Sequence, residues 1–238
     1  MRGEGAVRQW GRGAVVLLAA CVPTLPPLPI PVGLAESSIE AAASWSDSTR
    51  PVGYRDIRFR FQFRDENGSG GGRGRARLAA PDSIRFDLAG PLGAFRASAF
   101  VVGDSAIWTD SEDQIRKLVP SYPLFWAMLG IVLRPDPGSR VRGLADSQIT
   151  AWQFSVDRDT VEYVREFGAR PRLLAEVRQA GKVVGRVETK FGPDGPPISS
   201  RLTVPRPAAR LDLTFSQNAS AVPFAPETWH FPTPPGDR

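Results

Sequence analysis

The sequence has very few of the side chains that enzyme active sites and metal centres most often use. Its 238 residues include one cysteine, Cys21, and one histidine, His230. These counts exclude an internal disulfide and argue against nucleophilic triads and most zinc sites. No HExxH, GxSxG or P-loop motif occurs, and we expect the close carboxylates of 110–113 and 157–159 to lie in solvated turns. The sequence therefore predicts no enzyme activity, no metal site and no cofactor.

Lysine is also scarce, although the pI is about 10.0. Only Lys117, Lys182 and Lys190 are lysines among the 30 basic residues. Residues 1–20 hold three arginines and one glutamate, so the rest of the chain has 27 basic and 24 acidic residues. A nucleic-acid-binding protein gathers its basic residues into a patch. Here arginine alternates with apolar residues, which predicts a solvated sheet face and no nucleic-acid partner.

The N-terminus has the pattern of an export signal. Arg2, Arg8 and Arg12 precede a short apolar run at 14–20, and Cys21 follows at once. A basic segment, an apolar segment and small residues at the cleavage point define a signal peptide. The Leu-Ala-Ala-Cys sequence that ends at Cys21 resembles the bacterial lipobox. We therefore predict cleavage before Cys21 and acylation of its thiol.

Three other interpretations of this segment compete. Ordinary secretion prefers small residues at both −3 and −1, but Leu18 stands at −3. An uncleaved transmembrane anchor would fit the uncharged stretch 14–34 in length, but five prolines interrupt it. A chance cysteine in a cytosolic protein is the third. The lipoprotein interpretation explains the apolar run and the cysteine together.

The remaining chain divides into a short linker and one domain. Residues 1–20 are the predicted signal peptide, and 21–34 are the predicted lipidated cysteine and proline-rich tether. Residues 35–238 then form one domain, a length that all-β proteins fold as a unit. Residues 35–50 are rich in alanine and compatible with a helix.

Beyond residue 50 the pattern is that of β-strands. Residues 57–63 alternate apolar and polar side chains, which predicts one buried and one solvated face. The glycine-rich stretch 67–72 predicts a flexible turn. The other predicted strands are 73–79, 83–88, 95–102, 106–109, 149–156, 160–167, 173–178, 182–191, 198–204 and 210–215. Short turns between them predict an antiparallel meander.

One segment, 123–133, is apolar almost all round but too short to span a bilayer. It predicts a buried helix. We therefore expect a curved sheet folded over a helical plug, whose interior is either filled by that helix or partly left for a ligand.

Several stretches resemble the LolA/LolB-like lipoprotein-carrier superfamily, in particular its uncharacterised bacterial lipoprotein branch. The resemblance covers about 40–235 and rests on strand and turn patterns, not on a catalytic signature. The stretches are PDSIRFDLAGPLGAFRASAFVVGDSAIWTD, SYPLFWAMLGI, VVGRVETKFGPDGPPISSRLTV and TFSQNASAVPFAPETWHFPTPPG.

The resemblance implies a mainly β fold, a strongly curved antiparallel sheet forming an unclosed half-barrel, with a few helices covering or plugging its concave face. It also implies an apolar hollow that accepts acyl chains. In that superfamily LolA carries lipoproteins through the periplasm, and LolB, itself a lipoprotein, receives them at the outer membrane. A lipobox on such a fold resembles the LolB arrangement. Val22 is not Asp, the inner-membrane retention residue of enteric bacteria.

These points give a set of expected partners and a location. The chain is expected on the outer membrane, facing the periplasm and anchored through acylated Cys21. Its expected ligands are acyl chains of lipids or lipoproteins, with a periplasmic carrier as a further candidate partner, and we expect a monomer. A lipid-sensing or protein-binding regulatory module and a structural envelope lipoprotein with a filled core are the alternative functions.

The apolar hollow would be lined by side chains from two strands and the plug. Each of them has the alternative role of an ordinary core residue. The predicted acyl-chain contacts are Phe59, Phe61, Phe63, Ile84, Phe86, Leu88, Phe125, Trp126 and Leu129. Residues 91–95 are a candidate for a membrane-inserting loop, with a tight turn as the alternative.

Overall fold

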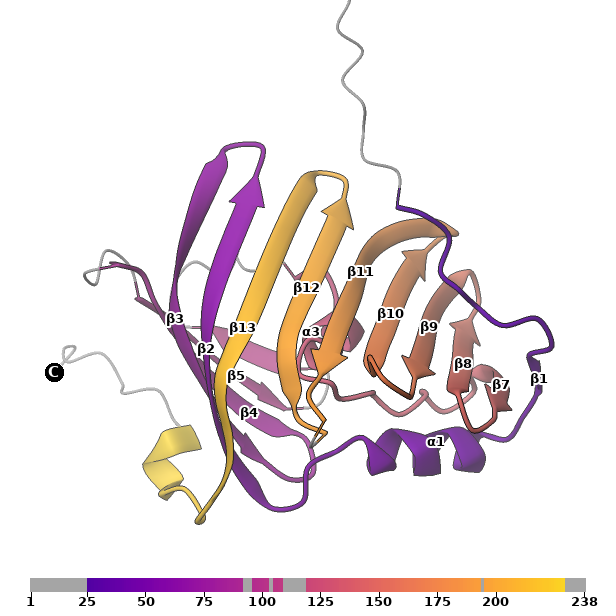
Figure 1. Cartoon of the computed structure of the whole chain (residues 1–238), viewed down its shortest axis with the longest axis horizontal. Helices are drawn as coiled ribbons and strands as arrows, with labels where there is room; N and C mark the ends of the chain where they lie inside the picture. Colours follow the sequence, from indigo (N-terminus) through magenta and orange to yellow (C-terminus); the bar gives the residue numbers. More distant parts are fainter. Residues whose placement is uncertain (1–24, 92–95, 103–104, 109–118, 194, 230–238) are drawn as a thin grey trace, which may run out of the picture.

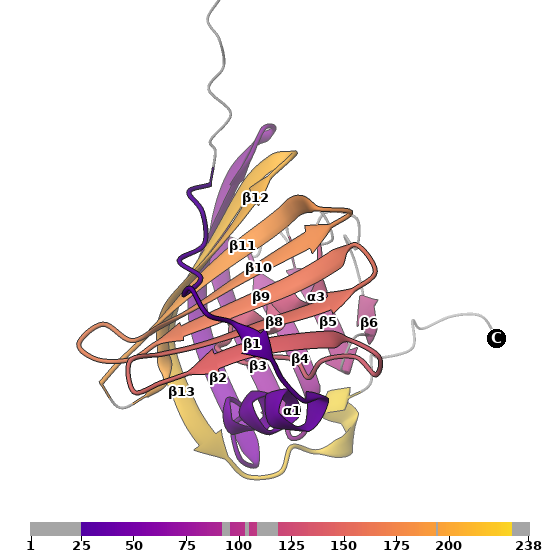
Figure 2. The same cartoon turned by 90° about the vertical axis from the view of Figure 1, so that its right-hand side faces the viewer.

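A strongly bent antiparallel sheet forms most of the structure. The computed structural model describes residues 25–91, 96–102, 105–108, 119–193 and 195–229. Within these residues thirteen strands form one sheet, in the order β1-β7-β8-β9-β10-β11-β12-β13-β2-β3-β4-β5-β6. The sheet bends around two helices, but its edge strands β1 and β6 do not pair with each other (Figures 1 and 2). The predicted unclosed, mainly β fold is confirmed.

The strands form two consecutive meanders. The first contains β2 (Tyr54–Asp65), β3 (Gly68–Ala79), β4 (Ser83–Ala89), β5 (Arg96–Val102) and β6 (Ser105–Trp108). The second contains β7 (Arg140–Ala145), β8 (Ile149–Val156), β9 (Asp159–Glu166), β10 (Arg172–Gln179), β11 (Lys182–Phe191), β12 (Pro197–Pro205) and β13 (Ala208–Ala221). The short β1 (Ala35–Glu36) pairs with β7 at the edge. The sequence pattern did not predict β1 or β7.

Pairing of β13 with β2 joins the two meanders into one sheet. In this register Leu213 faces Phe61, and Leu211 faces Phe63. Because successive side chains of a strand point to opposite faces, apolar residues of both meanders line the same concave side. That side holds the main hydrophobic core.

The glycine-rich stretch is strand and not the flexible turn that its composition predicted. The turn is confined to Glu66 and Asn67, where the Asp65 carboxylate accepts the backbone N–H groups of Asn67 and Gly68 at 2.8 and 2.9 Å. The glycines continue β3 and pair along β2. At Gly70 and Gly74 the rings of Phe63 and Phe59 on β2 occupy the space of a side chain, and at Gly72 a Cβ would meet the Ala89 carbonyl oxygen at 2.1 Å and the Phe61 ring at 2.9 Å.

Helix α1 (Ile39–Ser48) lies within the helix-compatible stretch and covers the inner face beside β7–β9. Its first turn is capped by Ser38, whose hydroxyl accepts the N–H of Ala41 at 3.1 Å. Trp45 faces the sheet, with its ring centroid 6.0 Å from that of Trp152 and 6.2 Å from that of Tyr163. Helix α1 is therefore the first of the predicted covering helices.

The apolar segment 123–133 is buried as predicted, but only its first part is helical. Helix α3 (Tyr122–Ala127) has six residues, and the chain then turns at Gly130, whose φ is +80°. A side chain there would meet the ring of Phe191 at 2.8 Å. The turn redirects Ile131 and Val132, both buried, as extended chain along the core.

Both ends of the described chain cross the convex face of the sheet. The N-terminal strap, residues 25–34, runs over β8–β11 (Figure 2). Leu28 is buried there against Ala151, Val164 and Leu174. The predicted tether 21–34 thus has its described part held on the sheet and not extended away from it. At the other end, the short 3-10 helix η2 (Pro226–Trp229) places Trp229 against Phe100.

Within the described residues, none of the helices has the length and apolar character needed to cross a membrane.

Candidate functional site

All nine predicted acyl-chain contacts lie together on the concave side. They come from β2, β4, α3 and the turn after α3, and they belong to, or pack against, the main apolar cluster. The rings of Phe86 and Phe125 have centroids 4.9 Å apart, and those of Phe59 and Phe86 are 5.6 Å apart. The structure therefore brings the sequence-predicted residues into one place.

Most of these nine side chains are covered by other parts of the protein. Those that are buried in the present arrangement are Phe59, Phe61, Ile84, Phe125, Trp126 and Leu129. Phe63, Phe86 and Leu88 are only partly buried. The six behave as core, and the other three keep some exposed apolar surface, although the Phe86 ring packs against Phe125 of α3. An acyl chain would meet these three first, or would need to displace α3.

Helix α3 occupies the hollow mainly through apolar contacts with β10 and β11. Leu124 fits over Gly185, where a Cβ would lie 2.6 Å from the Leu124 methyl group. The polar connections include Thr189, whose hydroxyl donates to the carbonyl of Ala127 at 2.7 Å. An apolar surface that one element covers is a surface that an acyl chain can also cover.

A pocket of about 390 Å³ opens beside α3. It lies between the end of α1, the first residues of β2, the last residues of β13 and the β11–β12 turn. Apolar residues of the inner face form part of its wall, including Ile57, Leu78, Leu129 and Phe191. Ligand pockets for small molecules are of this size, about 300–1,000 Å³. Of the nine predicted residues, only Leu129 lines it.

Two arginines give this pocket a positive side. The Arg50 guanidinium donates to the carbonyl of Pro81 at 2.7 Å, and its Nε lies 3.7 Å from an Asp47 carboxylate oxygen. Arg55 donates to the side-chain oxygens of Asn218 and Ser220, both at 3.0 Å. No aspartate or glutamate belongs to the described lining. The pocket therefore combines an apolar wall with cationic groups, which suits an anionic amphiphile.

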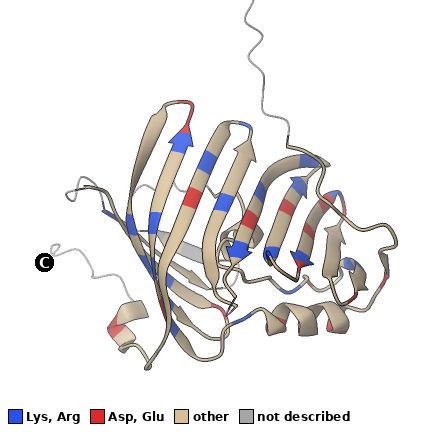
Figure 3. Ribbon diagram, viewed as in Figure 1, with Lys and Arg blue, Asp and Glu red and all other residues tan. Residues whose placement is uncertain are grey.

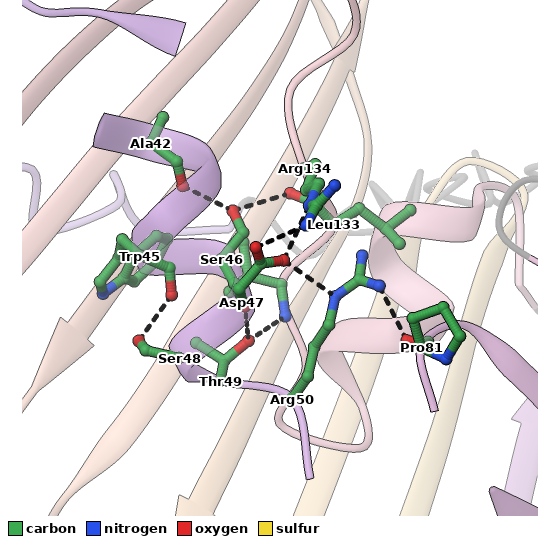
Figure 4. Close-up of polar contacts among 11 residues, drawn as sticks. Ala42, Trp45, Ser46, Asp47, Ser48, Thr49, Arg50, Pro81, Leu133 and Arg134 are labelled. Atoms are coloured by element: carbon green, nitrogen blue, oxygen red, sulfur yellow. Dashed lines mark hydrogen bonds and ion pairs between the residues drawn. The ribbon is translucent and has the colours of Figure 1, made fainter. Parts of the chain in front are cut away.

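Figure 4 shows how the end of α1 is fixed beside this pocket. Asp47 accepts two hydrogen bonds from Arg134, at 2.7 and 2.6 Å, and these bonds lower the pKa of Asp47. The buried hydroxyl of Ser46 donates to the carbonyl of Leu133 at 3.2 Å. The Thr49 hydroxyl accepts the N–H of Val132 at 2.9 Å. These bonds join α1 to the extended chain that follows α3.

Arg165 is a cation on the inner face of β9. Its guanidinium carbon lies 3.4 Å from the centroid of the Phe191 ring and 5.8 Å from that of Phe167. Burial lowers the pKa of Arg165 to about 10, because the charged form loses contact with water. It remains charged at neutral pH and is stabilised by the aromatic rings.

Arg50, Arg55 and Arg165 were not among the residues predicted from the sequence. The alternation of side chains along β9 could have identified Arg165, because it places this arginine on the same face as the buried Tyr163. No local pattern marks Arg50 or Arg55, because their pocket is assembled from segments far apart in the sequence. The candidate membrane-inserting loop 91–95 falls on residues 92–95, which lie outside the described residues, as do Cys21, His230 and the carboxylates of 110–113.

An unclosed antiparallel sheet with helices in its hollow defines a class of half-barrel proteins. No protein-family model and no curated protein matches this chain. A LolA superfamily protein from Nitrosomonas europaea superposes with a TM-score of 0.53 at 11% identity, covering 79% of this chain and 96% of that one. An outer membrane lipoprotein-sorting protein domain from Vibrio parahaemolyticus superposes with a TM-score of 0.51 at 10% sequence identity, covering 81% of this chain and 97% of that one. The chain therefore has the LolA/LolB-like fold, as its motifs predicted.

Proposed function

We propose that this protein is a periplasm-facing lipoprotein of the outer membrane that binds the acyl chains of lipids or lipoproteins and acts in lipoprotein transport or insertion. The observation that carries the proposal is the 390 Å³ pocket, which joins inner-face apolar side chains to Arg50 and Arg55. The apolar wall suits an acyl chain, and the guanidinium groups suit the phosphate or carboxylate of its head. The predicted lipobox at Cys21 and the LolA/LolB-like fold support the location.

The energetics of such a carrier need no chemical step. Each methylene hidden from water contributes about 0.8 kcal/mol, so a 16-carbon chain offers roughly 12 kcal/mol. Leaving a bilayer loses about the same amount. Transfer between membrane and pocket is therefore close to balanced, and small differences in pocket shape set its direction.

The test is native mass spectrometry of the chain from residue 22, secreted behind an ordinary signal and purified without detergent. This chain keeps the N-terminal strap in place. We expect bound fatty acid, phospholipid or lipopeptide. The variant Arg50→Glu should retain less anionic lipid, because it places a negative charge beside the pocket. The matched variant Arg158→Glu, in the exposed turn between β8 and β9, should retain as much as the original.

A clean apo mass with no uptake of added lipopeptide would contradict acyl-chain binding. It would instead favour the structural envelope lipoprotein, because six of the nine predicted contact residues are already buried by the protein itself.

A further inference from the structure

Arginines face one another across neighbouring strands on the convex side of the sheet. The directly opposed pairs are Arg58 with Arg75, Arg60 with Arg73, and Arg64 with Arg210. Like charges in this position destabilise a sheet. Three such pairs on adjacent strands lower the stability of the fold, so stability of the sheet is not the reason for these arginines.

Nearby carboxylates neutralise only part of this charge. Asp56 binds Arg75 through two hydrogen bonds of 2.7 Å, and Asp212 binds Arg210 and Arg201 at 2.6 and 2.7 Å. Four arginines remain exposed, with no carboxylate within ion-pair distance among the described residues. They form what we call the arginine face: Arg58, Arg60, Arg64 and Arg73. Figure 3 shows blue segments along β2 and β13 on this side.

The first residues of the N-terminal strap lie on the same convex side, close to the arginine face. Arg186 of β11 donates a hydrogen bond to the carbonyl of Pro26. Arg186 pairs with Thr203, Thr203 with Arg210, and Arg210 with Arg64. Neighbouring strands lie about 4.8 Å apart, so this row places Arg64 about 14 Å from Arg186.

The short chain before the strap limits how far a lipid anchor can lie from this side. Pro26 is five residues from Cys21, and an extended chain of that length spans at most about 18 Å. This step rests on the lipid anchor of the proposed function. Because this segment is short, an acylated Cys21 would keep the bilayer surface close to the convex side. A long free tether would let the domain move away from the bilayer.

We propose that the arginine face docks on an anionic phospholipid bilayer, the membrane that holds the acyl chains of Cys21. The exposed guanidinium groups bind lipid phosphates, and each arginine near such a surface raises the affinity about fivefold. Docking by this face leaves α1 and the 390 Å³ pocket beside it turned away from the convex side and open to the periplasm. The opposed arginine pairs are then stabilised by a surface outside the protein.

The experiment uses the full chain, expressed with its signal and reconstituted as the acylated protein. Acylation consumes the Cys21 thiol, so Gln62→Cys supplies a single fluorophore site between Arg60 and Arg64 on the exposed face of β2. Vesicles contain a quencher on some headgroups and are made of phosphatidylcholine alone or with phosphatidylglycerol. The control label is placed by Glu40→Cys, an exposed position on α1. Flotation of the vesicles reports the anchor separately from the docking.

We expect the label at position 62 to lose most of its fluorescence on phosphatidylglycerol vesicles, and the label at position 40 to keep its own. The double variant Arg60→Gln/Arg73→Gln should abolish the quenching, whereas Arg140→Gln/Arg170→Gln should not. Salt of about 1 M, where the Debye length is about 3 Å, should also abolish it.

Two outcomes overturn docking while the anchor stands: a floating protein whose position 62 is no more quenched than position 40, or quenching that is equal on phosphatidylcholine alone. A protein that does not float overturns the anchor and the docking together. Binding of the arginine face to an acidic protein in place of lipid would appear as the first of these outcomes.

Discussion

Phe59 of β2 lies directly across from Gly74 of β3, and its ring occupies the space where a side chain on Gly74 would be. A Cβ at Gly74 would stand 2.2 Å from two ring carbons of Phe59. Phe63 has the same relationship to Gly70, and at Gly72 the Ala89 carbonyl oxygen excludes a side chain together with the Phe61 ring. The glycines let the rings lie against the neighbouring strand, and the inner face becomes apolar without side chains from β3 at these positions.

This relationship predicts that Gly74→Ala destabilises the fold by about 1–3 kcal/mol, because Phe59 must leave its position in a buried site. Urea unfolding measures the change. In a Phe59→Leu background the same substitution should cost less, which a double-mutant cycle detects. Ser69→Ala, at an exposed position of the same strand, is the control. Equal costs of Gly74→Ala in both backgrounds would contradict the proposed contact.

The N-terminal strap predicts a clear difference between two of its apolar residues. Leu28 is 8% exposed and Val32 is 101% exposed. Leu28→Ala should destabilise by about 2–3 kcal/mol, through lost burial and the cavity left on the sheet. Val32→Ala should change stability by less than about 0.5 kcal/mol. Limited proteolysis should cut residues 25–34 faster in the first variant only. Similar cleavage of both variants would show that Leu28 does not hold the strap.

One of the hydrogen bonds that attach α1 uses the hydroxyl of Thr49, directly after the helix. Thr49→Val removes the acceptor of the buried Val132 N–H, which should cost about 1–3 kcal/mol of unfolding free energy. Thr49→Ser keeps the hydroxyl and should recover most of the loss. Hydrogen exchange should be faster across α1 in the valine variant. If both variants match the original, then α1 is held by its other contacts.

Asp56 predicts a pH dependence. The hydrogen bonds from Arg75 lower the pKa of Asp56, although burial opposes them. A carboxyl with a lowered pKa contributes stability that is fully present above its unfolded pKa of about 3.9 and is lost as the pH falls through its folded pKa. Asp56→Asn should therefore cost about 1 kcal/mol at pH 7, reduced by the partial exposure of Arg75. The melting curves should converge below about pH 4.

The control for this pH dependence is Asp157→Asn, at an exposed turn position. It should show no comparable convergence. A constant difference between Asp56→Asn and the original at all pH values would assign the effect to packing.

Acylation of Cys21 is tested separately. Cys21→Ser removes the only thiol of the chain, so incorporation of labelled palmitate and cleavage before residue 21 should both be lost. Incorporation that persists in this variant would place the lipid on another residue and remove the basis for the lipobox interpretation.

The order of apolar and polar residues was sufficient to predict many strands. The periods of β2, β11 and β12 are visible in the chain itself, because each buries one face and leaves the other more exposed. The apolar segment that contains α3 was recognisable as buried, and the motifs indicated the unclosed half-barrel. Such features follow from local periodicity, which does not depend on the partner strand.

Local periodicity contains no information about register or about contacts between distant segments. Glycine composition predicted a turn at 67–72, but pairing with β2 makes 68–72 strand, and the Phe63 ring lies where a side chain of Gly70 would be. Arginine alternation predicted a diffuse solvated face, whereas pairing of β13, β2 and β3 sets the arginines opposite one another. The pocket of Arg50 and Arg55 is likewise assembled from separate segments.

The sequence by itself thus determined most of the strands and the buried plug, and it predicts the export signal. Only the tertiary structure decided which side chains meet across the sheet, that α3 fills the hollow, and that residues 25–34 lie on the convex side. The reason is physical: a strand's alternation depends on its own residues, but the free energy of pairing, covering and filling depends on surfaces supplied by segments far away in the chain.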